Sequence, residues 1–268
     1  MSRIRRVTTL LIGALFALSL AAPAFAQDGE AQVRVAHLSP DAPNVDIYVN
    51  DEPVGALTNV PYGTVSPYLP LPEGSQNVKV YASGDTSEPV LEADVDLSAG
   101  SAYTIAAVGL VGDGSLAAQV YEDDLSAPEE GNANLRVVHA SPDAGPVDVV
   151  PEGGEALVSD LEFPDASPYA SVPAGTYTLN VNAAGTDTTA IQVPGATVEA
   201  GTVYSAFAIG TAEAGNLEVL LVADNAAGAG TSAETIPDTG GVSPIAVAGI
   251  AALLAGAGLF AIRRRALR

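Results

Sequence analysis

Two copies of a His-x-Ser-Pro-Asp-Ala motif contain the residues of this sequence that are best suited to chemistry. Their polar members, with the Asp that follows each motif, are His37, Ser39, Asp41 and Asp46 in the first copy and His139, Ser141, Asp143 and Asp148 in the second. Residues two apart on a strand share a face, so His37 and Ser39 beside an Asp have the residue types of a hydrolytic triad. One hypothesis is therefore an extracellular hydrolase or a ligand-capturing protein that uses this turn.

The same residues also fit a purely structural turn. Pro40 fixes its own φ, a carboxylate such as Asp41 accepts backbone N–H bonds, and His37 ties the turn to a neighbouring strand. The sequence has no G-x-S-x-G nucleophile elbow. A scaffold turn must recur in every copy of a domain, whereas an active site need not. We therefore interpret the motif as structural and predict that the protein is not an enzyme and has no catalytic residue.

The composition excludes several classes of site. The chain has no Cys, which rules out disulfides, thiolate zinc sites and iron-sulfur clusters. Its 10 Lys and Arg against 32 Asp and Glu give a net charge of −22, which argues against binding nucleic acid. Trp, common on flat sugar-binding surfaces, is absent. Tyr62 and Tyr121 lack a Tyr at the corresponding position of the other copy, so we expect them to be exposed contact residues.

The acidic residues raise the question of a metal. Asp94 and Asp96, and also Asp123 and Asp124, offer the oxygen ligands that Ca²⁺ takes. No EF-hand spacing is present, and scattered acids usually form a solvated face. We predict no cofactor and no metal ligand, with Ca²⁺ binding as the alternative.

The motif belongs to a long internal repeat. His37 and His139 are 102 residues apart, and the Ser-Pro-Tyr, Pro-x-Gly and Ala-Gly-x-x-Tyr segments recur at an offset of 101. A period this long means tandem copies of a whole domain. We place the copies at residues 27–128 and 132–225, expect each to fold alone, and predict a flexible linker at 226–235.

Each copy has the pattern of an all-β domain. Short runs such as 45–49 and 78–81 alternate apolar and polar residues between Gly, Pro and Asp, whereas 103–110 is almost entirely apolar, as in a central strand. No long segment has helical periodicity. The pattern predicts two tandem antiparallel β-sandwiches of the immunoglobulin-like kind.

The repeated H-x-S-P-D-A-x-x-V-D pattern, followed by S-P-Y, P-x-G and A-G-x-x-Y, resembles the bacterial envelope family labelled domain of unknown function 4397. The resemblance covers residues 32–125 and 134–225. It implies a tandem architecture and an envelope location, and it implies no established reaction.

The N-terminus has the three parts of a secretory signal peptide. Basic residues at 3–6 precede an apolar run at 7–22, and Ala24-Phe25-Ala26 supplies the small residues of a cleavage site. We predict that residues 1–26 are removed on secretion.

The C-terminus combines a pentapeptide, an apolar run and a basic tail. Ile236, Pro237, Asp238, Thr239 and Gly240 precede the uncharged segment 242–262, whose length of about 30 Å as a helix matches a bilayer core. The tail 263–268 is predicted to be cytoplasmic by the positive-inside rule. The order of these parts resembles the LPxTG-type cell-wall sorting signal of Gram-positive surface proteins, with Ile236 in place of the usual Leu.

This second resemblance implies both an anchoring reaction and a location. A membrane sortase would cut between Thr239 and Gly240 and join the Thr carboxyl to cell-wall peptidoglycan; the alternative is a plain transmembrane anchor. We thus expect a non-enzymatic protein displayed at the surface of a Gram-positive-type envelope for adhesion, spacing or envelope organisation. Its extracellular ligand is not named by the sequence.

Overall fold

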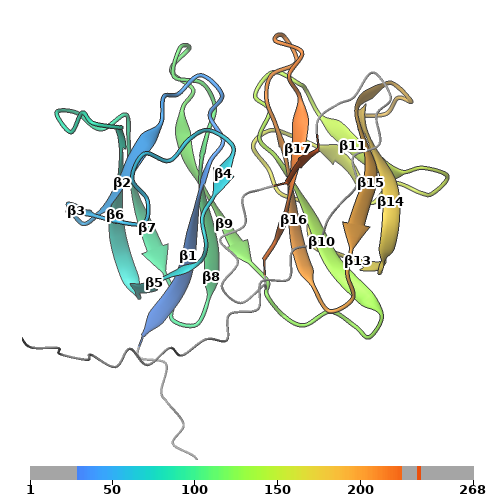
Figure 1. Ribbon diagram of the computed structural model, residues 1–268, viewed down its shortest axis with the longest axis horizontal. Helices are drawn as coiled ribbons and strands as arrows, with labels where there is room; N and C mark the ends of the chain where they lie inside the picture. Colours follow the sequence, from blue (N-terminus) through green and yellow to red (C-terminus); the bar gives the residue numbers. More distant parts are fainter. Residues whose placement is uncertain (1–28, 225–233, 237–268) are drawn as a thin grey trace, which may run out of the picture. The chain divides into compact units, whose positions relative to one another are not determined.

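The computed structural model describes residues 29–224 and 234–236, which form eighteen strands (Figure 1). These described residues contain no helix long and apolar enough to cross a membrane. The predicted signal peptide at 1–26, the transmembrane helix at 242–262 and the basic tail at 263–268 lie outside them. So do Pro237 to Gly240 of the pentapeptide.

Nine strands make up repeat 1, the first structural copy. They are β1 (Glu30–His37), β2 (Val45–Val49), β3 (Glu52–Pro53), β4 (Thr64–Val65), β5 (Leu69–Pro72), β6 (Gly74–Ala82), β7 (Leu91–Leu97), β8 (Ala102–Val108) and β9 (Ala117–Asp123). One sheet has the order β4-β1-β8-β9, with β5 also paired to β1, and the other has the order β3-β2-β6-β7.

Repeat 2 has the same plan. Its strands are β10 (Asn132–His139), β11 (Val147–Pro151), β12 (Val158–Leu161), β13 (Ala170–Pro173), β14 (Gly175–Ala183), β15 (Thr189–Val198), β16 (Val203–Ile209), β17 (Glu218–Ala223) and β18 (Glu234–Ile236). The sheets run β13-β10-β16-β17-β18 and β12-β11-β14-β15. Strand β18 pairs with β17 and joins the end of the predicted linker to the first residue of the pentapeptide.

One strand pair in each repeat is parallel, so the prediction of purely antiparallel sheets is wrong at this point. β1 runs parallel to β8, and β10 runs parallel to β16. The alternation of apolar and polar residues predicts where strands lie, but it does not predict which strands pair. Between β1 and β8 the chain crosses through β2, β6 and β7 of the other sheet, which supplies the long connection that parallel neighbours need. The all-β fold and its two tandem domains are confirmed.

Apolar residues of the two sheets pack into one core within each repeat. In repeat 1 this core includes Val33, Ile47, Val80, Val95 and Tyr103. The equivalent core of repeat 2 is built from the same strand positions. All seven residues of β8 and all seven of β16 are buried, as the apolar run at 103–110 predicts for the first copy.

A third buried cluster contains residues of both repeats, and we call it the shared cluster. Its members are Ala36, Leu38, Val65, Ala106, Val108 and Tyr121 from repeat 1 and Val138, Ala140, Phe207, Ile209, Leu220 and Val222 from repeat 2. The two copies therefore share buried surface, and the expectation that each folds alone stays a prediction. Even-numbered positions of β1 and β8 face this cluster, whereas odd-numbered ones face the core of repeat 1.

Candidate functional site

The two motif histidines are buried and bonded to the backbone of their own turns. His37 is 1% exposed and His139 is fully buried. The Nε2 atom of His37 lies 3.0 Å from the Pro43 oxygen, and that of His139 lies 2.7 Å from the Gly145 oxygen. A carbonyl oxygen only accepts hydrogen bonds, so each Nε2 carries the ring hydrogen and is the hydrogen-bond donor. Both rings thus fasten the loop that follows the motif.

The motif aspartates hold a second loop of the same repeat. Both carboxylate oxygens of Asp41 accept backbone N–H bonds, from Val111 and Gly112, each at 2.8 Å. Ser39 adds a 3.3 Å bond to the same carboxylate. These carboxylate bonds are to backbone and Ser groups rather than to an imidazole.

Repeat 2 has the same arrangement for its motif aspartate. Asp143 accepts N–H bonds from Ala212 and Glu213 at 2.7 and 2.9 Å. Ser141 donates its backbone N–H to Nδ1 of His139 at 3.3 Å, which leaves that nitrogen as an acceptor. A Ser-His catalytic pair would require a hydrogen bond between the Ser hydroxyl and the imidazole. Here the imidazole bonds the backbone N–H of Ser141 instead.

The later Asp of each copy bridges two further loops. Asp46 accepts the backbone N–H of Asn59 at 2.6 Å and that of Gly84 at 3.2 Å. Asp148 accepts those of Asp160 and Gly185 at 2.8 and 2.9 Å. These N–H bonds lower the pKa of both carboxyls, because they favour the charged form.

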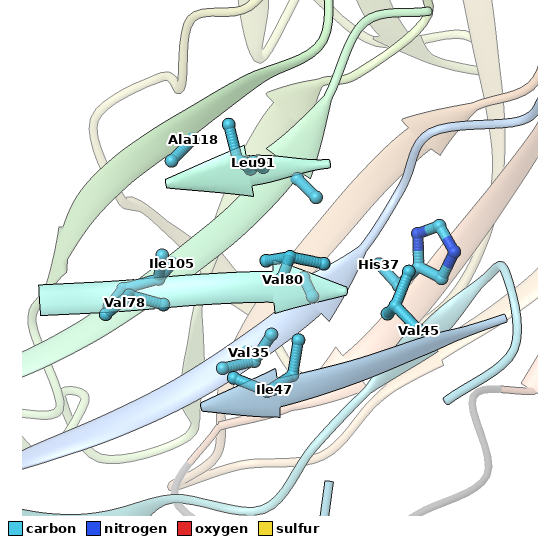
Figure 2. Close-up of a pocket in the computed structure, with 11 residues that line it drawn as sticks. Val35, His37, Val45, Ile47, Val78, Val80, Leu91, Ile105 and Ala118 are labelled. Atoms are coloured by element: carbon cyan, nitrogen blue, oxygen red, sulfur yellow. The ribbon is translucent and has the colours of Figure 1, made fainter. Parts of the chain in front are cut away.

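The space beside His37 is too small for a substrate. The cavity beside His37 in repeat 1 has a volume of about 10 Å³. Figure 2 shows His37 beside Val45 at one end of it, with Ile47 and Val80 among its apolar walls. A cavity of this volume has room for about one water molecule. The geometry therefore supports a structural role for the motif.

The buried histidines make a pH dependence of stability measurable. Burial lowers the pKa of His37 and of His139, against the opposing effect of their carbonyl bonds, so the folded protein favours neutral rings. Unfolded His titrates near pH 6.5, so this stabilisation is complete above that pH and is lost as the pH falls through it. We expect the free energy of unfolding to fall between pH 7 and pH 5 by at most about 1.4 kcal/mol per pH unit for each ring, and the melting temperature to fall with it.

Glutamine at both positions removes the titrating group but keeps a donor. The melting temperature of His37→Gln/His139→Gln should therefore depend less on pH than that of the parent over the same interval. Groups common to both proteins, such as Asp224, cancel in this comparison. Identical slopes would contradict the assignment of neutral buried rings.

A buried ionic network joins the two repeats. Arg34 of β1 donates to Asp224, which follows β17, with its Nη1 2.7 Å from Oδ1. Arg136 of β10 donates through Nη2 to Asp123 at the end of β9. Each arginine thus pairs with an aspartate of the other repeat. All four side chains are at most 2% exposed.

Two hydroxyl groups complete the pattern. Thr104 accepts from Arg34 Nε at 2.8 Å and donates to Asp123 at 2.7 Å. Ser205 accepts from Arg136 Nε at 2.8 Å and donates to Asp224 at 2.6 Å. We call these six residues, Arg34, Thr104, Asp123, Arg136, Ser205 and Asp224, the inter-repeat network.

Tyrosines of the Ser-Pro-Tyr segments cover the network. The guanidinium of Arg34 lies 4.8 Å from the ring centroid of Tyr68, and that of Arg136 lies 5.0 Å from the ring centroid of Tyr169. Tyr68 also donates to Asp123. This explains why these Tyr residues recur in both copies: each stacks on a cation and reduces the cost of burying it.

Burial has opposite consequences for the two kinds of charged group. It raises the pKa of Asp224, although Arg34 and Ser205 favour the charged form. Burial lowers the pKa of Arg34, but the attractions to Asp224, Tyr68 and Asp123 together outweigh it, so the pKa of Arg34 is raised. The network therefore depends on both partners being present.

Sequence reasoning missed Arg34 and Arg136 as site residues. The signal was present, since they are two of the three basic residues between positions 27 and 239, and they occupy equivalent positions of the two copies. Asp123, weighed as a Ca²⁺ ligand, instead contacts Arg136, Thr104 and Tyr68. Within the described residues no group of three or more His, Asp or Glu side chains is placed to hold a metal ion.

The two tyrosines expected at the surface are not exposed. Tyr121 is buried at 6% exposure and donates to the Pro164 oxygen of the other repeat at 2.5 Å. Tyr62 is half-buried, and burial raises its pKa to about 12. Both residues pack with the shared cluster. The lack of a Tyr at the corresponding position of the other copy therefore reflects an asymmetry between the two sides of the contact between the repeats, and not an exposed ligand-binding surface.

Comparisons with known proteins agree with the repeat. The family described as domain of unknown function (DUF4397) matches residues 31–150 and again 150–235. The structural repeats divide earlier, between β9 and β10. No curated protein matches this sequence. Among solved structures, the Bacillus anthracis TIE protein is similar over 68% of this chain and 34% of its own, at 12% identity and a TM-score of 0.22.

Proposed function

Because the chain belongs to the DUF4397 family in two tandem copies, we propose that it is a non-enzymatic protein displayed on a Gram-positive-type envelope for adhesion, spacing or envelope organisation. The observation that carries this proposal is the inter-repeat network. It fastens the two repeats to each other through buried ion pairs in both directions. A body held in this way suits a spacer or display platform.

The motif residues support the non-enzymatic side of the proposal. His37, Asp41 and Asp46 each bond to backbone groups of their own repeat, and so do their counterparts. The facing sheets of each repeat are in line with an immunoglobulin-like sandwich, an architecture common in cell-surface domains.

The sorting signal supplies the proposed route to the surface. After removal of residues 1–26, a membrane sortase would cut between Thr239 and Gly240 and link the chain to peptidoglycan; retention by the segment 242–262 is the alternative. β18 pairs with β17 and ends at Ile236, so the predicted cleavage point lies three residues beyond the last strand of repeat 2.

Thr239→Ala tests the anchoring step. We expect the parent chain to be released from cells only by cell-wall hydrolases, and the variant to stay in the membrane fraction and be extracted by detergent. Ser243→Ala, which lies beyond the cut, is the matched control and should behave as the parent. Equal detergent extraction of parent and Thr239→Ala would contradict sortase anchoring and favour the plain membrane anchor.

A further inference from the structure

Repeat 2 contains an apolar cavity of about 150 Å³ between its two sheets. Leu135, Val172, Ala196 and Val198 form buried walls, and the partly buried Tyr177 lies at its margin. No charged side chain is among the lining residues. The Tyr177 hydroxyl is already engaged, because it donates to the Pro173 oxygen at 2.7 Å.

Local differences between the repeats account for this space. In repeat 1, β6 and β7 pair without a break, with Gln76 opposite Val95. In repeat 2, Tyr177 pairs with Ala196, and the register then shifts by one residue near Gly195, whose φ is +72°. A bulge bends the strand that carries it.

Side-chain size adds to the effect of the bulge. Where repeat 1 has the buried residues Val95 and Leu97, repeat 2 has Ala196 and Val198. Together these replacements remove three carbon atoms from the same wall of the core. Larger residues elsewhere, including Leu135 and Leu179, line the space without closing it.

We propose that this cavity of repeat 2 is a binding site for a small, uncharged, hydrocarbon-rich molecule about the size of one aromatic ring. A cavity of about 150 Å³ lined by apolar side chains stays dry and takes up benzene or xenon. An anion has no cationic partner among the lining residues and would meet the field of a chain with net charge −22. This site is separate from the motif and from the inter-repeat network.

Benzene is the probe for this proposal, measured on the full chain with ¹³C-labelled leucine methyl groups. Four lining residues carry such methyls: Leu135, Leu157, Leu179 and Leu221. We expect saturable shifts of these four signals and a rise in melting temperature with benzene. Benzoate, of similar size but charged, should shift them at least about tenfold more weakly.

The variant Ala196→Val/Val198→Leu introduces the repeat 1 residues and fills the cavity. One methylene in an apolar pocket changes affinity about 10- to 200-fold, so benzene binding should fall at least tenfold while the fold is kept. Ala196→Val alone is a milder second variant. Val95→Ala/Leu97→Val, at the equivalent positions of repeat 1, is the matched control and should leave the four shifts unchanged.

Three results would overturn the proposal. One is the lack of a saturable shift in the parent chain. Another is a shift that persists in both filled variants, which would place benzene elsewhere. The third is an equal response of leucine methyls in both repeats, which would mean non-specific partitioning into β-sandwich cores.

Discussion

Replacing Arg34 with alanine is expected to destabilise the protein by about 3–5 kcal/mol, because the variant leaves the Asp224 carboxylate buried without its main partner. Residues of both repeats meet in the shared cluster, so the cooperative unit spans close to 200 residues. For a unit of this size the loss corresponds to about 6–20 °C in melting temperature. Thermal unfolding followed by circular dichroism measures it directly.

Two comparisons separate charge burial from other causes. Lys79→Ala removes a cation from the exposed pair with Asp51 and should leave the melting temperature unchanged. Arg34→Met/Asp224→Leu removes both buried charges and should be more stable than Arg34→Ala, since it leaves no buried carboxylate without its cation. A loss in Arg34→Ala no greater than that in Lys79→Ala would contradict the network.

The effect of Arg34→Ala should also shrink in acid. Burial raises the pKa of Asp224 in the folded protein, so folding favours its neutral form; this contribution is present at low pH and is lost as the pH rises through the folded value. Without Arg34 the preference for the neutral form becomes stronger. The difference in stability between parent and variant should therefore be smaller at pH 5 than at pH 7.

Separating the repeats is expected to have the second large effect. A fragment of residues 29–127 exposes Ala36, Leu38 and Val108 of the shared cluster. In it Arg34 loses Asp224 and Asp123 loses Arg136, which leaves only the longer 3.8 Å contact between Arg34 and Asp123. A fragment of residues 129–238 exposes the complementary face. We expect each alone to melt at least 10 °C below the intact chain, since each loses burial and one partner of two ion pairs.

Mixing the fragments provides the control. Because the contacts that join the repeats are non-covalent, equimolar fragments should form a one-to-one complex with a higher melting temperature than either alone. Analytical ultracentrifugation gives the stoichiometry, and Arg136→Ala in the second fragment should weaken the complex. Monomeric fragments that both melt at the temperature of the intact chain would show that the shared cluster contributes nothing.

Much of the fold could be predicted from short-range patterns. The alternation in 45–49 and the apolar run at 103–110 identify β2 and β8, and the 102-residue offset separates the repeats. The parallel pairing of β1 and β8 could not be predicted, because alternation is a property of one strand and pairing is a property of two. Full burial of β8 indicated a second covered face without saying that the other repeat covers it.

The site was predicted less completely, for a related reason. The turn of His37 and Asp41 is made of local contacts and contacts within one repeat, which turn chemistry anticipates. The pairs Arg34 with Asp224 and Arg136 with Asp123 cross between copies. A repeat aligned with itself shows which positions recur, but it does not show whether a recurring Arg meets the Asp of its own copy or of the other.

The crossed pairing has a consequence for the number of copies that such a chain can hold. Each repeat offers one arginine and one aspartate on a single face, and the other repeat satisfies both with the same face of its own. This is the self-complementary contact of a two-fold dimer, made here within one polypeptide. Such a contact closes on itself, so a third copy added in line would have this face uncovered, and its arginine and aspartate would lack partners from another repeat. Chains built on this interface should extend by even numbers of repeats, each pair closed before the next begins.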